Sequence, residues 1–299
     1  MIREDALSPV VAFMLLLMVI VSFISLLNAY YIPSLKQQSE ITHLQQTEQG
    51  MLAISSDIDR MISFKQDATI KERFPLGGGD VIFSPVRSSG TIQISPESWI
   101  LNITFTNESS YSTTFNITAP SISYHPVGNF WVNQGYTWNK GIINITKNKR
   151  TTWLEYIDTK NATQGENQFI QILATPVTVT KAFLSENNTL ANITVSATNI
   201  TPDSEHAFVS SNGMGNIGLT MSTYQELIVN VTSLQIVVNS NLPKEQFDEV
   251  NKMIENWVIS SFTCSNCVST TNLPEYKIAF HDYPVNFTLQ EKMLKISTI

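Results

Sequence analysis

Residues 9–27 read Pro9-Val-Val-Ala-Phe-Met-Leu-Leu-Leu-Met-Val-Ile-Val-Ser-Phe-Ile-Ser-Leu-Leu27, and no charged residue occurs between Asp5 and Lys36. A helix needs roughly 20 apolar residues to cross the hydrocarbon core of a bilayer. We therefore predict a membrane-spanning helix that reaches to about residue 29 and contacts membrane lipid.

The residues before this run indicate how the helix begins. Ser8 suits the N-cap of a helix, and Pro9 suits its first turn, where a missing N–H costs nothing. A cleaved secretory signal would have a basic head, an apolar stretch of ~7–15 residues and a small-x-small cleavage site. The head instead has Arg3 against two acidic residues, and Leu27 is too large for that site. A signal anchor that is never cut stays open as an alternative.

The segment Asp5-Ala-Leu-Ser-Pro-Val-Val11, followed by a helix rich in Met, Leu, Val and Ile, resembles the amino-terminal region of archaeal type IV pilins. The resemblance implies that a prepilin peptidase cuts between Ala6 and Leu7. Residues 1–6 would then be a leader, and the apolar helix would stay in the mature protein. The chain departs from the family at Asp5-Ala6, where Gly or a basic residue is common.

The same resemblance implies that the apolar helix bundles with copies of itself or with other pilins. The residues expected to form this assembly surface are Ser8, Pro9, Val10, Val11, Phe13, Leu16, Ile20, Phe23 and Leu27.

The helical pattern continues beyond the apolar run, so we predict one long helix over residues 7–64. Pro33 should kink or loosen it near Tyr30-Tyr31, two aromatic residues that suit a membrane–water boundary. Beyond that point, apolar residues recur at spacings of three, four or seven, which indicates an amphipathic helix. This stripe packs either on its own domain or on neighbouring copies: Ile41, Leu44, Met51, Ile54, Ile58 and Met61.

Residues 65–299 are predicted to form an extracellular, β-rich, sandwich-like region with one helix from Lys244 to about Ser261, which makes the fold class α+β. Alternating apolar and polar residues mark Trp99–Thr106 as a strand. The region is one domain or is split near the polar segment 199–218. Four further segments have the same strand character: Phe169–Leu184, Leu190–Thr198, Leu227–Asn239 and Tyr276–Leu289.

Charge and composition limit the choice of partners. The net charge is −7 and only 14% of residues are charged. Nucleic-acid binding requires a basic surface, so we expect no nucleic-acid partner. A neutral, polar surface suits an extracellular domain, which places the N-terminus in the cytoplasm before assembly.

Asn-x-Ser/Thr sequons are frequent, and most have the form Asn-apolar-Thr. On a strand, this spacing places Asn and Thr on one face and the apolar residue on the other. They are either N-glycosylation sites or exposed strand residues. The candidates are Asn102, Asn107, Asn116, Asn144, Asn161, Asn187, Asn192, Asn199, Asn230 and Asn286.

The two cysteines lie close together, as Cys264-Ser-Asn-Cys267. A redox pair would open a helix, and a zinc site would need two more ligands, with only His281 nearby. We expect a local disulfide, with free thiols as the alternative, and no metal.

No catalytic motif is visible, so we expect neither an enzyme nor a cofactor. The four histidines are scattered, and both G-x-S-x-G and H-E-x-x-H are absent. The aromatic residues Trp131, Tyr136 and Trp138 form either a binding loop or part of the core.

These features favour a structural subunit of an archaeal type IV pilus-like surface filament that serves adhesion or attachment. The alternative is a membrane-anchored cell-surface glycoprotein that does not polymerise and binds a ligand or an envelope partner. The stripe from Ile41 to Met61 distinguishes the two. In a filament, part of this stripe and most of Val10–Leu27 should contact other copies, whereas in an anchored monomer they should contact only the protein's own domain and lipid.

Overall fold

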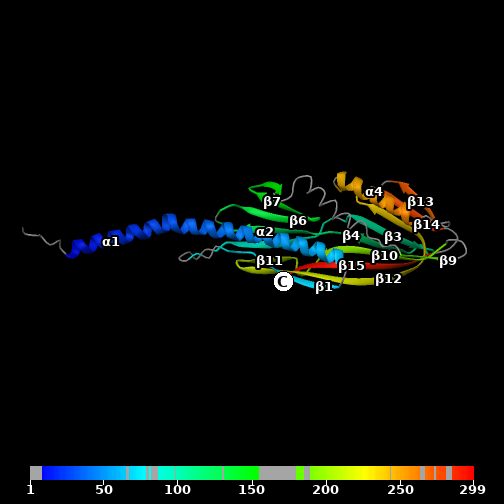
Figure 1. Cartoon of the computed structure of the whole chain (residues 1–299), viewed down its shortest axis with the longest axis horizontal. Helices are drawn as coiled ribbons and strands as arrows, with labels where there is room; N and C mark the ends of the chain where they lie inside the picture. The colour runs from blue at the N-terminus through cyan, green and yellow to red at the C-terminus, as the bar shows by residue number, and fades with distance from the viewer. Residues whose placement is uncertain are drawn as a thin grey trace, which may run out of the picture.

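The computed structural model describes residues 9–64, 67–78, 81, 87–97, 99–129, 131–154, 180–184, 189–242, 244–262, 267–272, 274–280 and 285–299. Within these residues the protein has an N-terminal helical rod, two β-sheets and one C-terminal helix, an α+β architecture as the sequence predicts. The rod follows the long axis of the molecule, and its first part extends away from the sheets (Figure 1).

Three segments follow one another without a break in the rod: α1 (Pro9–Leu26), the π-helical turn η1 (Leu27–Tyr31) and α2 (Ile32–Phe64). The continuous helix from Pro9 to Phe64 contains 56 residues. At a rise of 1.5 Å per residue its length is about 80 Å. The prediction of one long helix is confirmed from residue 9 onward.

The predicted loosening of the helix near Tyr30-Tyr31 is also confirmed. At the end of η1 the N–H of Ile32 bonds to the carbonyl of Leu27, five residues back instead of four. Pro33 follows directly and has no N–H to continue the helical ladder. Proline residues and π-helical turns are both known sites of irregularity in a helix, and here the two lie next to each other.

Nine strands form the larger sheet within the described residues, and six form the smaller one. The larger sheet has the order β13-β14-β12-β15-β10-β9, with β1 and β3 also pairing with β12, and β4 with β3. The smaller has the order β11-β2-β5-β6-β7-β8. The strands are β1 (Ala68–Pro75), β2 (Ser89–Ser95), β3 (Leu101–Asn107), β4 (Ser112–Ile117), β5 (Ser121–Val127), β6 (Gln134–Asn139), β7 (Ile142–Lys147), β8 (Arg150–Trp153), β9 (Thr180–Leu184), β10 (Thr189–Pro202), β11 (Phe208–Ser211), β12 (Met214–Val238), β13 (Cys267–Asn272), β14 (Glu275–Phe280) and β15 (Val285–Thr298).

The long strand β12 organises the larger sheet. Its first half pairs antiparallel with β1 and β15, and its second half with β3 and β14. The register with β15 shifts between Ile228 and Val231, and Asn230 has a φ of 56° there. Strand β10 pairs in parallel with β15, so strands far apart in the sequence lie side by side.

Helices α2 and α4 (Lys244–Ser261) pack against the sheets, and α2 contacts strands of both. Helix α2 packs on β1, β6 and β7, while α4 packs against the β12 and β13 region of the larger sheet. On α4, Val250, Ile254 and Val258 are buried, and Phe247 and Trp257 pack beside them, which confirms the predicted helix and its apolar face. One hydrophobic cluster contains residues of both sheets and both helices.

The strand predictions are confirmed in most places. Leu101, Ile103 and Phe105 in β3 are buried and alternate with partly exposed residues. The segment 199–218, expected to be a loop or domain boundary, is instead largely strand, because β10 extends to Pro202 and β12 begins at Met214. Most of its Ser, Asn and Gly residues lie on β10, β11 and β12, and only Ser204, Asn212 and Gly213 lie in the turns between these strands. Of the segment predicted as Phe169–Leu184, the structure describes only β9.

Candidate functional site

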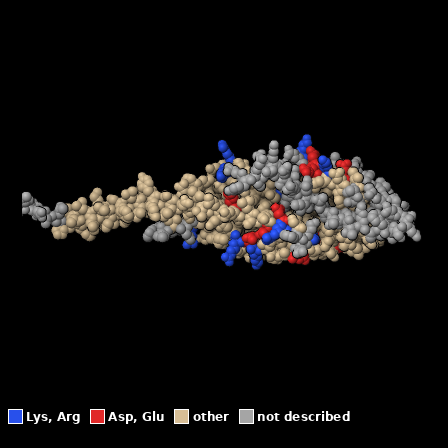
Figure 2. All heavy atoms as spheres, viewed as in Figure 1, with Lys and Arg blue, Asp and Glu red and all other residues tan. Residues whose placement is uncertain are grey.

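Helix α1 is the most unusual surface of the protein, because it is apolar and yet exposed along its whole length. None of its residues is buried. The exposed fraction of its large apolar side chains lies between 43% at Val11 and 68% at Val19. A water-soluble surface does not present an apolar patch of this size without a partner. Figure 2 shows that its described part has no Lys, Arg, Asp or Glu.

Two polar side chains of the first part of the rod make hydrogen bonds to the helix backbone. Ser22 Oγ donates to the carbonyl oxygen of Met18 at 2.7 Å, and Asn28 Nδ2 in η1 donates to that of Ile24 at 3.0 Å. In hydrocarbon an unsatisfied polar group costs several kcal/mol, so groups that satisfy themselves locally are compatible with a bilayer. α1 therefore has the properties of a membrane-spanning helix.

The length of α1 agrees with this interpretation. Its 18 residues rise about 27 Å, close to the ~30 Å hydrocarbon core of a bilayer. Tyr30 and Tyr31 follow in η1 and are exposed, as expected for aromatic residues at a membrane–water interface. The first charged side chain beyond them is that of Lys36. The protein thus has one N-terminal helix long and apolar enough to cross a membrane.

Most of the predicted assembly residues lie on this bare helix. Val10, Val11, Phe13, Leu16, Ile20 and Phe23 are all exposed, while Leu27 begins η1. Phe13, Leu16, Ile20 and Phe23 are spaced three or four residues apart, so they share one face of α1, and the other faces of the helix are mainly apolar as well. The leader, the expected cleavage point between Ala6 and Leu7, and Ser8 lie outside the described residues.

Helix α2 differs from α1 because its apolar stripe is used by its own domain. Leu44, Met51, Ile54, Ile58 and Met61 are buried against the sheets, and only Ile41 of the predicted stripe is partly exposed. Of the two alternatives for this stripe, the structure favours packing on its own domain.

Hydrogen bonds hold α2 on the smaller sheet. The Trp138 indole N–H donates to Ser55 Oγ at 3.1 Å, and the Tyr136 hydroxyl donates to the Leu44 carbonyl oxygen at 3.3 Å. Both aromatic side chains are almost completely buried. Burial raises the pKa of the Tyr136 hydroxyl, and the nearby carboxylate of Glu48 raises it further. Tyr136 therefore stays neutral and acts as a structural hydrogen-bonding group.

A second contact of α2 depends on the absence of a side chain. Gly50 faces β1, and a Cβ atom at this position would lie 3.0 Å from the ring of Phe74. The ring of Phe74 in turn lies 5.7 Å from that of Tyr124 in β5, measured between centroids. The helix thus approaches both sheets closely at this point.

Several polar groups are buried where α2 meets the sheets. Three of them lie on α2: Glu40, His43 and Thr47. Three buried polar atoms have no hydrogen-bond partner among the described residues, namely Glu40 Oε2, His43 Nδ1 and the Tyr124 hydroxyl oxygen. Burial is also the main cause of the raised pKa of the Tyr124 hydroxyl, and the charge of Glu40 adds to it. A buried polar group without a partner costs free energy, so these groups do not add to the stability of the contact.

One pair of carboxyl groups joins α2 to β1. A hydrogen bond to the Asp57 side chain is the main cause of the raised pKa of Glu72, and burial adds to it. Asp57 also accepts a hydrogen bond at 2.7 Å from the Arg60 guanidinium. This contact therefore ties α2 to the strand that follows it in the chain.

The sequon asparagines differ in their exposure to solvent. Asn199 is only 9% exposed, and its Oδ1 accepts hydrogen bonds from the Thr118 backbone N–H and hydroxyl at 3.0 and 2.8 Å. The expectation that Asn faces water fails here, because the β4–β5 connection covers this part of β10. Asn161 and Asn187 lie outside the described residues. The others are fully or partly exposed: Asn102, Asn107, Asn116, Asn144, Asn192, Asn230 and Asn286.

The remaining predicted sites can be placed only in part. Cys264 lies outside the described residues, and Cys267 is described only as the first residue of β13, so the disulfide stays a prediction. Tyr136 and Trp138 belong to the core, whereas Trp131 is 52% exposed. Among the described residues, no group of three or more His, Cys, Asp or Glu side chains could hold a metal ion.

No protein-family profile, curated protein or solved structure matches this chain. The interpretation of its function therefore depends on the bare helix α1, on the way α2 is docked, and on the resemblance of residues 5–11 to archaeal pilins.

Proposed function

We propose that the protein is a structural subunit of an archaeal type IV pilus-like surface filament that serves adhesion or attachment. The observation that carries the proposal is the bare, charge-free helix α1, continued by a helix that is firmly docked in the β-rich domain. Before assembly α1 would lie in the membrane lipid. After a prepilin peptidase removed residues 1–6, α1 would pack with the α1 helices of other copies or other pilins.

The rod geometry supports this proposal. Burying α1 against identical helices would remove the same apolar surface that a bilayer covers, so one helix can serve in both environments. The domain would then lie outside the filament core, because α2 continues the rod into it. An outward position also agrees with the accessible sequons, and we propose glycosylation at exposed positions only, which excludes Asn199.

The second candidate is a membrane-anchored surface glycoprotein that does not polymerise. One observation favours it: the stripe of α2 from Leu44 to Met61 is buried in its own domain and is not available to neighbours. Contacts between copies would then depend on α1 alone. In this candidate α1 stays in lipid, and the domain binds a ligand or an envelope partner.

The amino-terminal peptide of the native protein distinguishes the two candidates. We would measure its mass by mass spectrometry in the membrane fraction and in filaments sheared from the cell surface. A start at Leu7 in the sheared fraction supports the filament subunit. An uncut N-terminus found only in the membrane fraction overturns it and leaves the anchored protein.

A matched variant tests the cleavage point. Ala6→Leu places a large residue before the expected cut and leaves α1 unchanged. For the filament subunit we expect uncut protein that accumulates in the membrane and is lost from the sheared fraction. For the anchored protein the variant should behave as the native chain does.

A further inference from the structure

A polar cavity lies on the outer face of the smaller sheet. Tyr124 and Tyr136 point toward α2, so the residues next to them on β5 and β6, His125 and Gly135, lie on the opposite face. Gly135 has no side chain there, and a Cβ atom would lie 2.9 Å from the Tyr124 carbonyl oxygen and 3.8 Å from His125 Nδ1. The missing side chain leaves a hollow beside the His125 imidazole.

The cavity has a volume of about 330 Å³. This is at the lower end of the ~300–1,000 Å³ range of small-molecule sites, so it can hold a ligand of about one sugar ring. It is formed by β5, β6, β7 and the turn that joins β7 to β8. Both ends of that turn are fixed, because Lys147 pairs with Arg150, and the Asn148 N–H donates to the Asn133 carbonyl oxygen at 3.3 Å.

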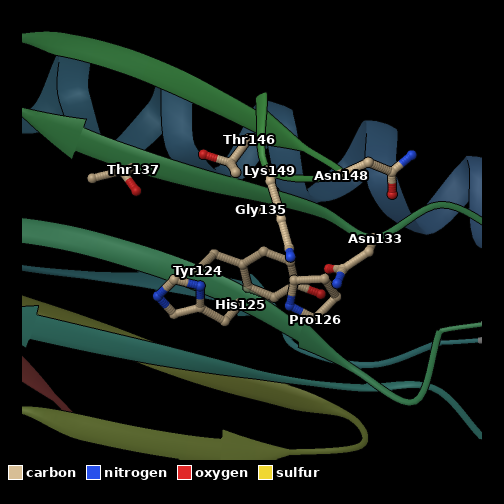
Figure 3. Close-up of a pocket in the computed structure, with 9 residues that line it drawn as sticks. All are labelled: Tyr124, His125, Pro126, Asn133, Gly135, Thr137, Thr146, Asn148 and Lys149. Atoms are coloured by element: carbon tan, nitrogen blue, oxygen red, sulfur yellow. The ribbon is translucent and has the colours of Figure 1, made fainter. Parts of the chain in front are cut away.

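The lining of the cavity is suited to an anion with hydroxyl groups. It offers the Lys149 ammonium, the His125 imidazole, the amide of Asn133 and the hydroxyls of Thr137 and Thr146, and it contains no carboxylate. This lining is unusual in a chain whose net charge is −7. Lys149 makes no ion pair within the described part of the chain, and its side chain extends from the turn toward Asn133 and Pro126 (Figure 3).

The backbone at Lys149 gives a second, independent argument. Asn148 and Lys149 have φ values of 47° and 72°, as the two central residues of a type I′ hairpin turn require. Gly is the preferred second residue of this turn, because a side chain there is strained. The neighbouring β6–β7 turn has the same pattern and does use Gly, with Lys140 at 49° and Gly141 at 82°. A Lys at this strained position points to a functional role for its side chain.

We propose that this cavity binds an acidic sugar residue, with Lys149 binding its carboxylate and the imidazole, amide and hydroxyl groups binding its hydroxyls. A charged hydrogen bond at one end and neutral hydrogen bonds around it fit a uronic acid better than a neutral sugar or a bare inorganic anion. The cavity lies in the β-rich domain, so the inference holds whether or not the protein polymerises. It gives the domain a defined ligand class at the cell surface.

The test is a titration of the full-length protein in detergent, followed by ligand-observed NMR. Methyl β-glucuronide is compared with methyl β-glucoside and with inorganic sulfate. We expect saturable binding of the glucuronide and at least roughly tenfold weaker binding of the glucoside, which lacks the carboxylate and its charge-assisted hydrogen bond. Sulfate keeps the charge but has no ring hydroxyls, so the loss of several neutral hydrogen bonds should also weaken its binding at least roughly tenfold.

Two variants distinguish binding in this cavity from a general attraction of the anion to positive surface charge. Lys149→Gly removes the ammonium and gives the turn its preferred residue, so the fold is kept, and we expect roughly a tenfold or greater loss of glucuronide affinity. Arg150→Gln removes a charge from the same hairpin outside the cavity and should leave the affinity unchanged. The proposal would be overturned if both variants lost the same affinity, or if the glucoside or sulfate bound as tightly as the glucuronide. It would also be overturned if the glucuronide did not bind at all.

Discussion

Helices α1 and α2 are two parts of one continuous rod, yet they are stabilised in different ways. Every side chain of α1 is at least partly exposed, and none is charged. On α2 the side chains of Met51, Ile54 and Ile58 are fully buried, and polar groups such as Ser55 hydrogen-bond to the sheet. The difference shows that contacts with its own domain stabilise α2, whereas the apolar surface of α1 stays exposed until lipid or other helices cover it.

The largest expected effect comes from placing charges in α1. Leu16→Arg combined with Ile20→Arg should disfavour membrane insertion by about 5–7 kcal/mol, because each Arg at a helix centre costs about 2.5–3.5 kcal/mol. The domain should keep its melting temperature, since neither residue contacts it. Carbonate extraction of membranes measures the first effect, and circular dichroism the second.

The control for this prediction is the conservative pair Leu16→Val and Ile20→Val, which should stay in the membrane. If the double Arg variant unfolded the domain as well, α1 would contribute to domain stability and the contrast between the helices would disappear.

The second effect concerns the buried stripe of α2. Ile54→Ala should lower the free energy of unfolding of the domain by about 2–5 kcal/mol, because Ile54 is fully buried and the change leaves a cavity. Thermal unfolding in detergent measures this loss, and membrane association should not change. The matched variant Ile20→Ala in α1 should leave the unfolding of the domain unchanged; a similar loss there would contradict the comparison.

A smaller effect is expected from the hydrogen bond between the helix and the sheet. Ser55→Ala removes the acceptor of the Trp138 indole N–H and should destabilise the domain by about 1 kcal/mol. Ser56→Ala changes the neighbouring, exposed residue of the same helix and serves as the control for helix propensity. Chemical denaturation of both variants measures the difference, which should vanish if the hydrogen bond does not hold α2 in place.

The smallest effect is a pH dependence at the contact between α2 and β1. The pKa of Glu72 is raised in the folded protein. At pH values just above the ordinary carboxyl pKa of ~4.3, Glu72 is therefore protonated more often in the folded state than in the unfolded state. The contribution of Glu72 to the free energy of unfolding therefore falls as the pH rises through this range. Glu72→Gln should remove this fall and raise the melting temperature at pH 7 more than at pH 4.

Melting curves of Glu72→Gln and the native protein across this pH range test the sign. The exposed turn residue Glu108 gives a control, since Glu108→Gln lies away from the Asp57–Glu72 pair. An equal gain at both pH values would show that the effect is not a titration of Glu72.

Much of the fold could be predicted because its elements have local signals. The amphipathic pattern of residues 244–261 predicted α4 and its buried face, and Pro33 predicted the irregular turn that the structure shows as η1. The extent of strand in segment 199–218 could not be predicted, because polar residues occur both in loops and on strands whose partners lie far away in the sequence. The burial of Asn199 has the same cause: Thr118, which covers it, is 81 residues away.

The sequence by itself determined the nature of α1, because the length and charge of an apolar helix decide its compatibility with a bilayer without reference to any neighbour. The tertiary structure alone decided which stripe of the rod is already covered, which sequons face the core, and that Lys149 and His125 share one cavity. These features depend on strand register and on which elements pack together. They arise from contacts between distant segments, which no local pattern encodes.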